Sequence, residues 1–153
     1  MIIEEEIKEL GFDTPSAIQH AKDGRLEEWV HRYCVTGEWK NIGLSDGLKL
    51  HKRWWNGPLE IELSKLTRVV GPEPNMEYNI NVDLWNKRIT EMSQSFTNEL
   101  ALPPLIVEYR SGKLRLADGN TRYGAMTLLG WQKCWVIIWY NSERDYLHHS
   151  SRL

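Results

Sequence analysis

The sequence has almost no cysteine. Only Cys34 and Cys134 occur among its 153 residues, and neither lies in a CxxC spacing. This argues against a disulfide framework and against a thiolate metal site. The five histidines show no HExxH spacing either. We therefore expect no metal site, reduced thiols in a cytoplasmic protein, and Cys134 packed at the start of an apolar strand.

Long hydrophobic runs and a positive net charge are missing as well. No stretch approaches the roughly 18 apolar residues of a membrane span, and the acidic start MIIEEEIKEL lacks the basic region of a signal peptide. The net charge of −2 counts against duplex nucleic acid as the main partner, because the phosphate backbone favours basic proteins. The length suits a single domain over residues 1–153.

Tryptophan, by contrast, is abundant. The periodic positions of most of the eight rings favour a core built from large aromatic side chains. The alternative, a surface on which bases stack, arises in one stretch, LKLHKRWW. Its basic and aromatic residues are Lys49, His51, Lys52, Arg53, Trp54 and Trp55. This pattern suits single-stranded nucleic acid, or else a solvated basic edge whose rings are tucked into the core.

The first 50 residues are predicted to be a helical extension. IIEEEIKEL, residues 2–10, carries apolar residues on one helical face. DTPSAIQHAKDG gives a second helix with Thr14 as its N-cap and Pro15 at the first helical position. RLEEWVHRYCVTG gives a third helix, which ends before Gly37.

The rest of the chain predicts a small mixed sheet with packed helices, an α/β (α+β) fold. NGPLEIELSKL indicates a half-buried strand after a turn at Asn56-Gly57, and TRVVGPEPNMEYN indicates a loop. NVDLWNKRITEMSQSFTNEL has the clearest helical period. Residues 105–109 and 113–117 form a predicted hairpin around Ser111-Gly112. CWVIIWY is a central strand covered on both faces, and the polar end gives about one helical turn.

Between the hairpin and the last helix-strand pair lies an unusually polar turn, ADGNTR, whose residues 118–122 we call the corner. Asp118 or Asn120 can cap the helix that begins there, and Gly119 allows a sharp turn and a close approach of a ligand to the main chain. The first N–H groups of a helix attract anions, and Arg122 has a planar fork suited to phosphate or carboxylate. The alternative is a capped helix with Arg122 paired to a nearby carboxylate.

The stretch LPPLIVEYRSGKLRLADGNTRYGAMTLLGWQKCWVIIWY resembles the ParB/sulfiredoxin superfamily, as a bacterial ParB N-terminal-like domain. The resemblance covers residues 58–140, and the extension lies outside it. It implies a nucleotide-phosphate site, with ATP, ADP or CTP and Mg²⁺, lined by Gly119, Asn120, Thr121 and Arg122. It also implies that the loop carrying Arg68, Glu73 and Glu77 faces the same cleft.

The positions at which this sequence departs from the superfamily motifs argue against some of the superfamily's activities. Sulfiredoxins need a cysteine in a G-G-C-H-R corner, where this chain has Asn120 and Thr121, so no thiolate nucleophile stands there. The corner of the free serine kinases reads D-G-H-H-R and matches only Asp118, Gly119 and Arg122. The DNA-binding region that follows this domain in partition proteins is not found before residue 153.

Three functions remain open from the sequence. The first is a small-molecule phosphotransferase, in which Arg122 and the helix N-terminus hold the phosphates, Asp118 holds Mg²⁺, and Glu73 or Glu77 serves as base. The second is a non-enzymatic nucleotide- or DNA-associated binding module. The third is the same fold with a vestigial site.

Overall fold

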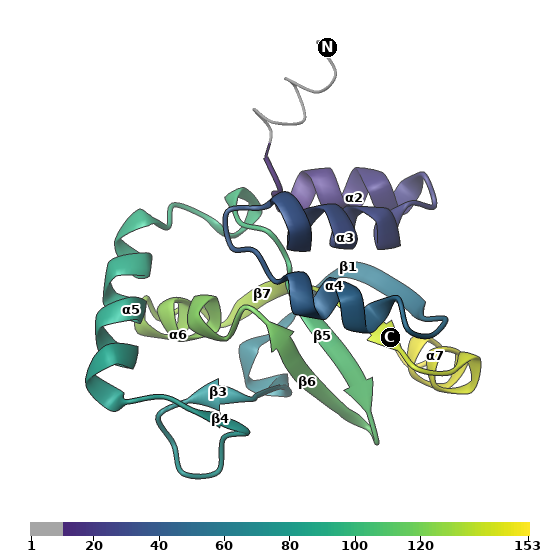
Figure 1. The fold of residues 1–153 in the computed structure, drawn as a ribbon. Helices are drawn as coiled ribbons and strands as arrows, with labels where there is room; N and C mark the ends of the chain where they lie inside the picture. Colours follow the sequence, from purple (N-terminus) through teal and green to yellow (C-terminus); the bar gives the residue numbers. More distant parts are fainter. Residues whose placement is uncertain (1–10) are drawn as a thin grey trace.

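The computed structural model describes residues 11–153 (Figure 1). The helix predicted over residues 2–10 lies outside the described residues. The helices are α2 (Thr14–Lys22), α3 (Leu26–Thr36), α4 (Ile42–Leu48), α5 (Val82–Ser95), α6 (Asn120–Leu128) and α7 (Glu143–Ser150), with short 3-10 turns at Leu63–Lys65 and Glu99–Ala101. The strands are β1 (Trp54–Glu62), β2 (Leu66–Arg68), β3 (Val70–Gly71), β4 (Tyr78–Asn79), β5 (Leu105–Arg110), β6 (Lys113–Asp118) and β7 (Lys133–Tyr140).

In the extension, α2 starts one residue earlier than predicted, and α4 was not predicted as a separate helix. Asp13, not Thr14, caps α2, because its carboxylate accepts from the Ser16 N–H, while the Thr14 hydroxyl donates to the Leu102 carbonyl. The third predicted helix is α3, and its C-cap is Gly37. The short helix α4 follows, capped by the side chain of Asn41.

The turn predicted at Asn56-Gly57 is wrong. Strand β1 runs straight through these residues, and its pairing with β7 is irregular between Asn56 and Leu59. The glycine has a φ of 113°. The residues that favour a turn also suit a bulge, which keeps the strand paired on both sides of the irregular step.

The loop predicted from Thr67 onward contains three short strands. β2 pairs in parallel with β6, and β3 pairs in parallel with β4. Strands of two or three residues are too short to show an alternating pattern in the sequence. β2 matters for the site, because it brings this segment against the strand that enters the corner.

The main sheet has the order β1-β7-β5-β6-β2. β7 runs antiparallel to β1 and parallel to β5, and β5 and β6 form the predicted antiparallel hairpin. Ser111 and Gly112 both have positive φ at its turn. β7 is therefore an interior strand of a mixed sheet, paired on both sides, as its continuous apolar sequence predicts, and the α+β class is confirmed.

The two faces of the sheet bury two separate hydrophobic clusters. Ile106, Ile137 and Trp139 pack against the helices of the extension. Val107, Val136 and Ile138 point to the opposite face, where they pack with residues of α6 and α7. Figure 1 shows the extension gathered on one side of the sheet and α5 stacked on α6 at its left end. The protein is thus layered helix–sheet–helix, with the corner at the edge between layers.

The contact between α5 and α6 depends on Gly124. A Cβ atom there would lie 2.7 Å from Ile89 Cγ2 and 2.7 Å from Trp85 Cζ2. Gly124→Ala is expected to destabilise the fold by about 1–3 kcal/mol through overpacking, although alanine is the better helix former. Urea denaturation measures this loss.

Gly43 in α4 is the matched control, because no atom lies within 4 Å of its added Cβ. Gly43→Ala is expected to stabilise the fold by roughly 0.4–1 kcal/mol. Equal effects of the two substitutions would contradict the close contact of α5 with α6.

Candidate functional site

The corner turns the chain from β6 into α6 through one glycine. Gly119 has a φ of 104° and stands at the N-cap position. A Cβ atom there would lie 2.4 Å from Leu105 Cδ2 and 3.0 Å from Arg122 Nη2. Both the left-handed backbone and the lack of space require glycine. The sharp turn that the sequence predicts is therefore present.

The side chain of Asp118 does not cap α6, contrary to the prediction. Its carboxylate is buried and faces the extension, where Oδ1 accepts from Asn41 Nδ2 at 2.9 Å and Oδ2 accepts from the Tyr33 hydroxyl at 3.1 Å. Oδ2 also accepts from Arg122 Nη2 at 2.8 Å. The extension thus takes part directly in the corner, which the sequence did not indicate.

Arg122 is 2% exposed and bonded to the protein through both Nη atoms. Nη1 donates to the Pro103 carbonyl at 2.7 Å, and Nη2 donates to the Tyr33 hydroxyl at 2.8 Å as well as to Asp118. The guanidinium also lies 5.1 Å from the centre of the Trp39 ring. The ion pair with a nearby carboxylate, one of the two alternatives for this residue, is therefore present.

The side chain of Asn120 does not cap the helix either. Its Oδ1 accepts from the N–H groups of Val69 and Val70 at 3.0 and 3.2 Å, and its Nδ2 donates to the Leu116 carbonyl at 3.0 Å. This buried amide ties the segment after β2 to the corner. Asparagine is suited to the position because it supplies an acceptor and a donor together.

These arrangements leave the first turn of α6 without a side-chain cap from any residue in the range 11–153. The first N–H groups of a helix have no partner within the helix. The residues of this turn line a cavity of about 520 Å³, together with Lys40 and Met92. Main-chain donors at the positive end of a helix dipole, facing a cavity, can hold an anion.

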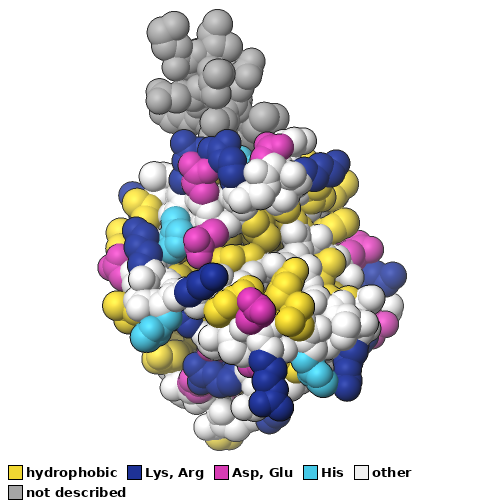
Figure 2. All heavy atoms as spheres, turned by 90° about the vertical axis from the view of Figure 1, so that its right-hand side faces the viewer, with side chains coloured by type: hydrophobic (Ala, Val, Ile, Leu, Met, Phe, Trp, Pro, Cys, Tyr) yellow, Lys and Arg dark blue, Asp and Glu magenta, His cyan; other side chains and the backbone are white. Residues whose placement is uncertain are grey.

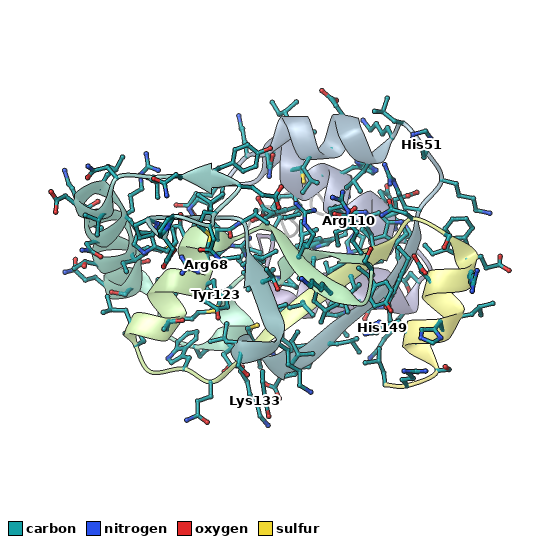
Figure 3. The ribbon with its side chains drawn as sticks, turned by 90° about the horizontal axis from the view of Figure 1, so that it is seen from below. His51, Arg68, Arg110, Tyr123, Lys133 and His149 are labelled. Carbon is teal, nitrogen blue, oxygen red and sulfur yellow. The ribbon has the colours of Figure 1, made fainter. Side chains whose placement is uncertain are left out.

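Arg68 and Glu73 form an ion pair beside α6. Glu73 Oε1 accepts from Arg68 Nη2 at 2.5 Å. The guanidinium of Arg68 lies 5.1 Å from the Trp85 ring and 5.7 Å from the Tyr123 ring, and Figure 3 shows Arg68 beside Tyr123. Burial raises the pKa of Glu73. The hydrogen bonds from Arg68 and the main chain lower this pKa by more than burial raises it, so the pKa lies below its usual value.

Glu77 belongs to a different cluster. It forms an ion pair with Arg115, which also pairs with Glu108. Glu108 is 5% exposed and accepts from Arg110 and Asn141 as well. These residues line a cavity of about 450 Å³, which shares Ala117 with the cavity at the first turn of α6 but is not lined by residues 119–122. The structure therefore does not bring Glu77 together with residues 119–122.

No cysteine stands at the corner, and neither thiol is a nucleophile at neutral pH. Cys34 and Cys134 are both free and buried. Burial raises the pKa of each thiol to about 12, so both remain protonated. Cys134 lies in β7 near its start, as predicted.

The basic stretch before β1 is largely used by the fold. Arg53 donates to the carbonyls of Gly47 and Leu48. Lys52 lies over the Trp54 ring at 5.1 Å, and Trp55 packs with the extension's cluster. On the face shown in Figure 2, Lys and Arg side chains are scattered among acidic and hydrophobic ones. This arrangement agrees with the second interpretation of the stretch, a basic edge whose aromatic rings pack into the protein.

Residues 11–153 contain neither a cluster of metal-binding side chains nor a membrane-spanning helix. No group of three or more His, Cys, Asp or Glu side chains is placed to hold a metal ion there. Within the same range, no helix is both long and apolar enough to cross a membrane.

No family model matches the chain. It is 36% identical over 53 residues to a nucleoid occlusion protein from Halalkalibacterium halodurans, a match that covers 35% of this chain and 19% of that protein. The predicted resemblance to the ParB/sulfiredoxin superfamily is borne out, over a limited part of both chains.

Three solved structures are similar in fold. Sulfiredoxin from Arabidopsis thaliana has a TM-score of 0.41 and 24% identity, covering 62% of this chain and 97% of that chain. A Pnob8-like ParB-N domain has a TM-score of 0.40 and 16% identity, covering 61% and 32%. A free serine kinase in complex with AMP has a TM-score of 0.36 and 18% identity, covering 52% and 30%. These are likenesses of shape, and none extends a ligand or an activity to this chain.

Sequence reasoning missed Tyr33, Trp39 and Asn41. Tyr33 lies on the apolar face of α3 and has the pattern of an ordinary core residue. Its hydroxyl is buried between two charged groups, and burial raises its pKa. Asn41 precedes a short helix and has the pattern of an N-cap, which it also is. No local signal indicates that both side chains reach Asp118.

Removing the Arg122 side chain is expected to lower the free energy of unfolding far more than removing an ordinary surface side chain. Arg122→Ala leaves the buried Asp118 carboxylate without its countercharge, which typically destabilises a protein by about 3–5 kcal/mol. Urea denaturation followed by circular dichroism measures this loss.

Arg25→Ala is the control, because Arg25 forms an exposed ion pair with Glu28. This substitution is expected to leave the denaturation midpoint in place. If Arg122→Ala also left the midpoint in place, the guanidinium would not be a structural element of the corner.

Proposed function

We propose that the corner binds the phosphate group of a nucleotide and that the chain is a nucleotide-binding module. The observation that carries this proposal is the first turn of α6. Its main-chain N–H groups are uncapped by any side chain of residues 11–153, and its residues line a cavity of about 520 Å³. Ligand cavities of roughly 300–1,000 Å³ are the usual size for small molecules and cofactors.

The rigid surroundings of the corner support this role. Asn120 and Arg122 are fixed by buried hydrogen bonds, so the N–H groups of the first turn are held in place before a ligand arrives. Such preorganisation lowers the entropic cost of binding. Lys40 at the rim of the cavity is exposed and carries a flexible positive charge. The direct phosphate contacts in this proposal are main-chain N–H groups and Lys40, while Arg122 keeps the turn in shape.

Asp118 does not fit the role of a magnesium ligand. Its Oδ1 accepts from Asn41, and its Oδ2 accepts from Tyr33 and Arg122. Coordination of a cation would require breaking these buried hydrogen bonds. We therefore assign Asp118 to the structure of the corner.

The phosphotransferase alternative requires a carboxylate that can act as a base at the cavity. Glu77 lies in the separate cluster with Arg115, and Glu73 is held by Arg68 through one oxygen. The other oxygen, Glu73 Oε2, is buried and has no hydrogen-bond partner in the described part of the chain. Glu73 does not line the cavity at the corner, so this oxygen is the single feature in favour of transfer, and incubation with ATP or ADP, Mg²⁺ and free serine tests it. Phosphoserine formed by wild type but not by Glu73→Gln would support the enzyme.

Nucleic acid has less support as a partner. In the basic stretch before β1, Arg53 already donates hydrogen bonds to carbonyl groups of α4. The net charge of the chain is −2. A nucleotide needs only the local donors of the corner, so it is the partner that the geometry favours.

The proposal is tested by removing one N–H group without changing charge. Thr121→Pro deletes the donor at the second position of α6, a position where proline is compatible with a helix because Pro15 occupies it in α2. Loss of one hydrogen bond to a charged ligand is expected to weaken nucleotide binding by about 1.5–3 kcal/mol. Calorimetry with ATP, ADP, CTP and GTP, with and without Mg²⁺, measures this change.

Thr121→Ala is the matched control, because it removes the side chain but keeps the N–H group. It is expected to bind the nucleotide as wild type does. Saturating ligand should stabilise wild type by about 2.7 kcal/mol at 100 times the dissociation constant, so thermal melting gives a second readout. Equal affinities of the proline and alanine variants would contradict the proposed main-chain contact.

A further inference from the structure

A second cavity adjoins the first at Trp39. It has a volume of about 860 Å³, and Glu38 and Trp39 line both cavities. The extension supplies one wall, including Phe12 and Tyr33, and the segment before β5 supplies the other, including Pro103. A ligand held at the first turn of α6 can therefore continue past Trp39 into this second space.

The second cavity has the chemistry of a site for a flat aromatic group. Phe12 lies edge-on to Tyr33 at 5.9 Å between ring centres, and Trp39 is partly exposed. The cation of Arg122 lies against the Trp39 ring at 5.1 Å, which fixes the ring at the boundary between the two cavities. Aromatic side chains that line a cavity bind flat rings by stacking and edge contacts.

Polar side chains in the same cavity suit the edges of such a ring. Arg32 and Glu38 are exposed and line the cavity, so they offer hydrogen-bond donors and an acceptor respectively. A nucleobase presents both kinds of group around a flat ring, whereas a lipid chain or an aliphatic metabolite does not. The two cavities thus differ in character: main-chain donors at one end and aromatic rings with polar neighbours at the other.

We infer that the larger cavity binds the base of the nucleotide, with Trp39 of the extension as its stacking partner. This inference rests on the proposed function, because the phosphates of the same ligand would lie at the corner. It also gives residues 11–50 a role in recognition: the extension forms the base site, and α6 forms the phosphate site.

The test compares nucleotides with tripolyphosphate, which has the phosphates but no base. Trp39→Ala is expected to weaken ATP or CTP binding by roughly 5- to 150-fold, the range for one base stacked on an aromatic side chain. Tripolyphosphate binding is expected to stay as in wild type. Trp135→Ala, which removes a partly buried ring lining a different cavity, is the matched control and should alter neither ligand. Calorimetry measures all the affinities.

A second measurement covers the case in which Trp39→Ala does not fold. Trp39→Phe keeps a ring against Arg122, and its fluorescence change on adding nucleotide is compared with that of wild type. Quenching by ATP or CTP that is present in wild type, absent in Trp39→Phe and absent with tripolyphosphate would support a base stacked on Trp39. Identical quenching in the two proteins would overturn it.

The outcomes separate the two proposals. If tripolyphosphate binds and Thr121→Pro weakens it, but Trp39→Ala leaves nucleotide affinity unchanged, the phosphate site stands and the base site is wrong. If Trp39→Ala weakens tripolyphosphate as much as ATP, the ring acts on the phosphates and the base site is also wrong. If neither ATP, ADP, CTP, GTP nor tripolyphosphate binds wild type, the proposed function itself fails and the base site fails with it.

Discussion

The pairing of Arg122 with Asp118 lies away from water, where two charges are costly to desolvate. The fold offsets this cost with further hydrogen bonds from Tyr33 and Asn41 to the carboxylate, and from the guanidinium to Pro103. Each bond reaches a different segment: α3, the start of α4, and the chain before β5. The position of the extension on the sheet therefore depends on charges in the corner as well as on hydrophobic packing.

The same pairing decides which groups of the corner remain available. Three polar side chains of the corner, Asp118, Asn120 and Arg122, are bonded to protein atoms. The main-chain N–H groups at the start of α6 have no such side-chain partner among residues 11–153, and the residues that carry them line the cavity. In the sequence the three side chains look reactive. In the structure they mainly hold the main chain of the corner in position, so that its N–H groups are available as donors. This favours binding over group transfer.

The sequence predicted the elements that have a clear period. α5, the β5–β6 hairpin, α6 and β7 follow from spacing and turn residues, and the corner lies where the glycine and polar residues indicate. The bulge in β1 was taken for a turn because the same residues serve both. The roles of Asp118 and Arg122 could not be predicted from the sequence, for a different reason. Their partners Tyr33 and Asn41 lie more than 70 positions away, and nothing local marks them as neighbours.

Asn41 has two tasks, since its oxygen caps α4 and its nitrogen holds Asp118. The stretch that resembles the superfamily, residues 58–140, contains the carboxylate but neither Asn41 nor Tyr33. The sequence resemblance and the hydrogen-bonded corner therefore have different borders in this chain. A border drawn at residue 58, where the resemblance begins, would separate a buried negative charge from two of its three donors.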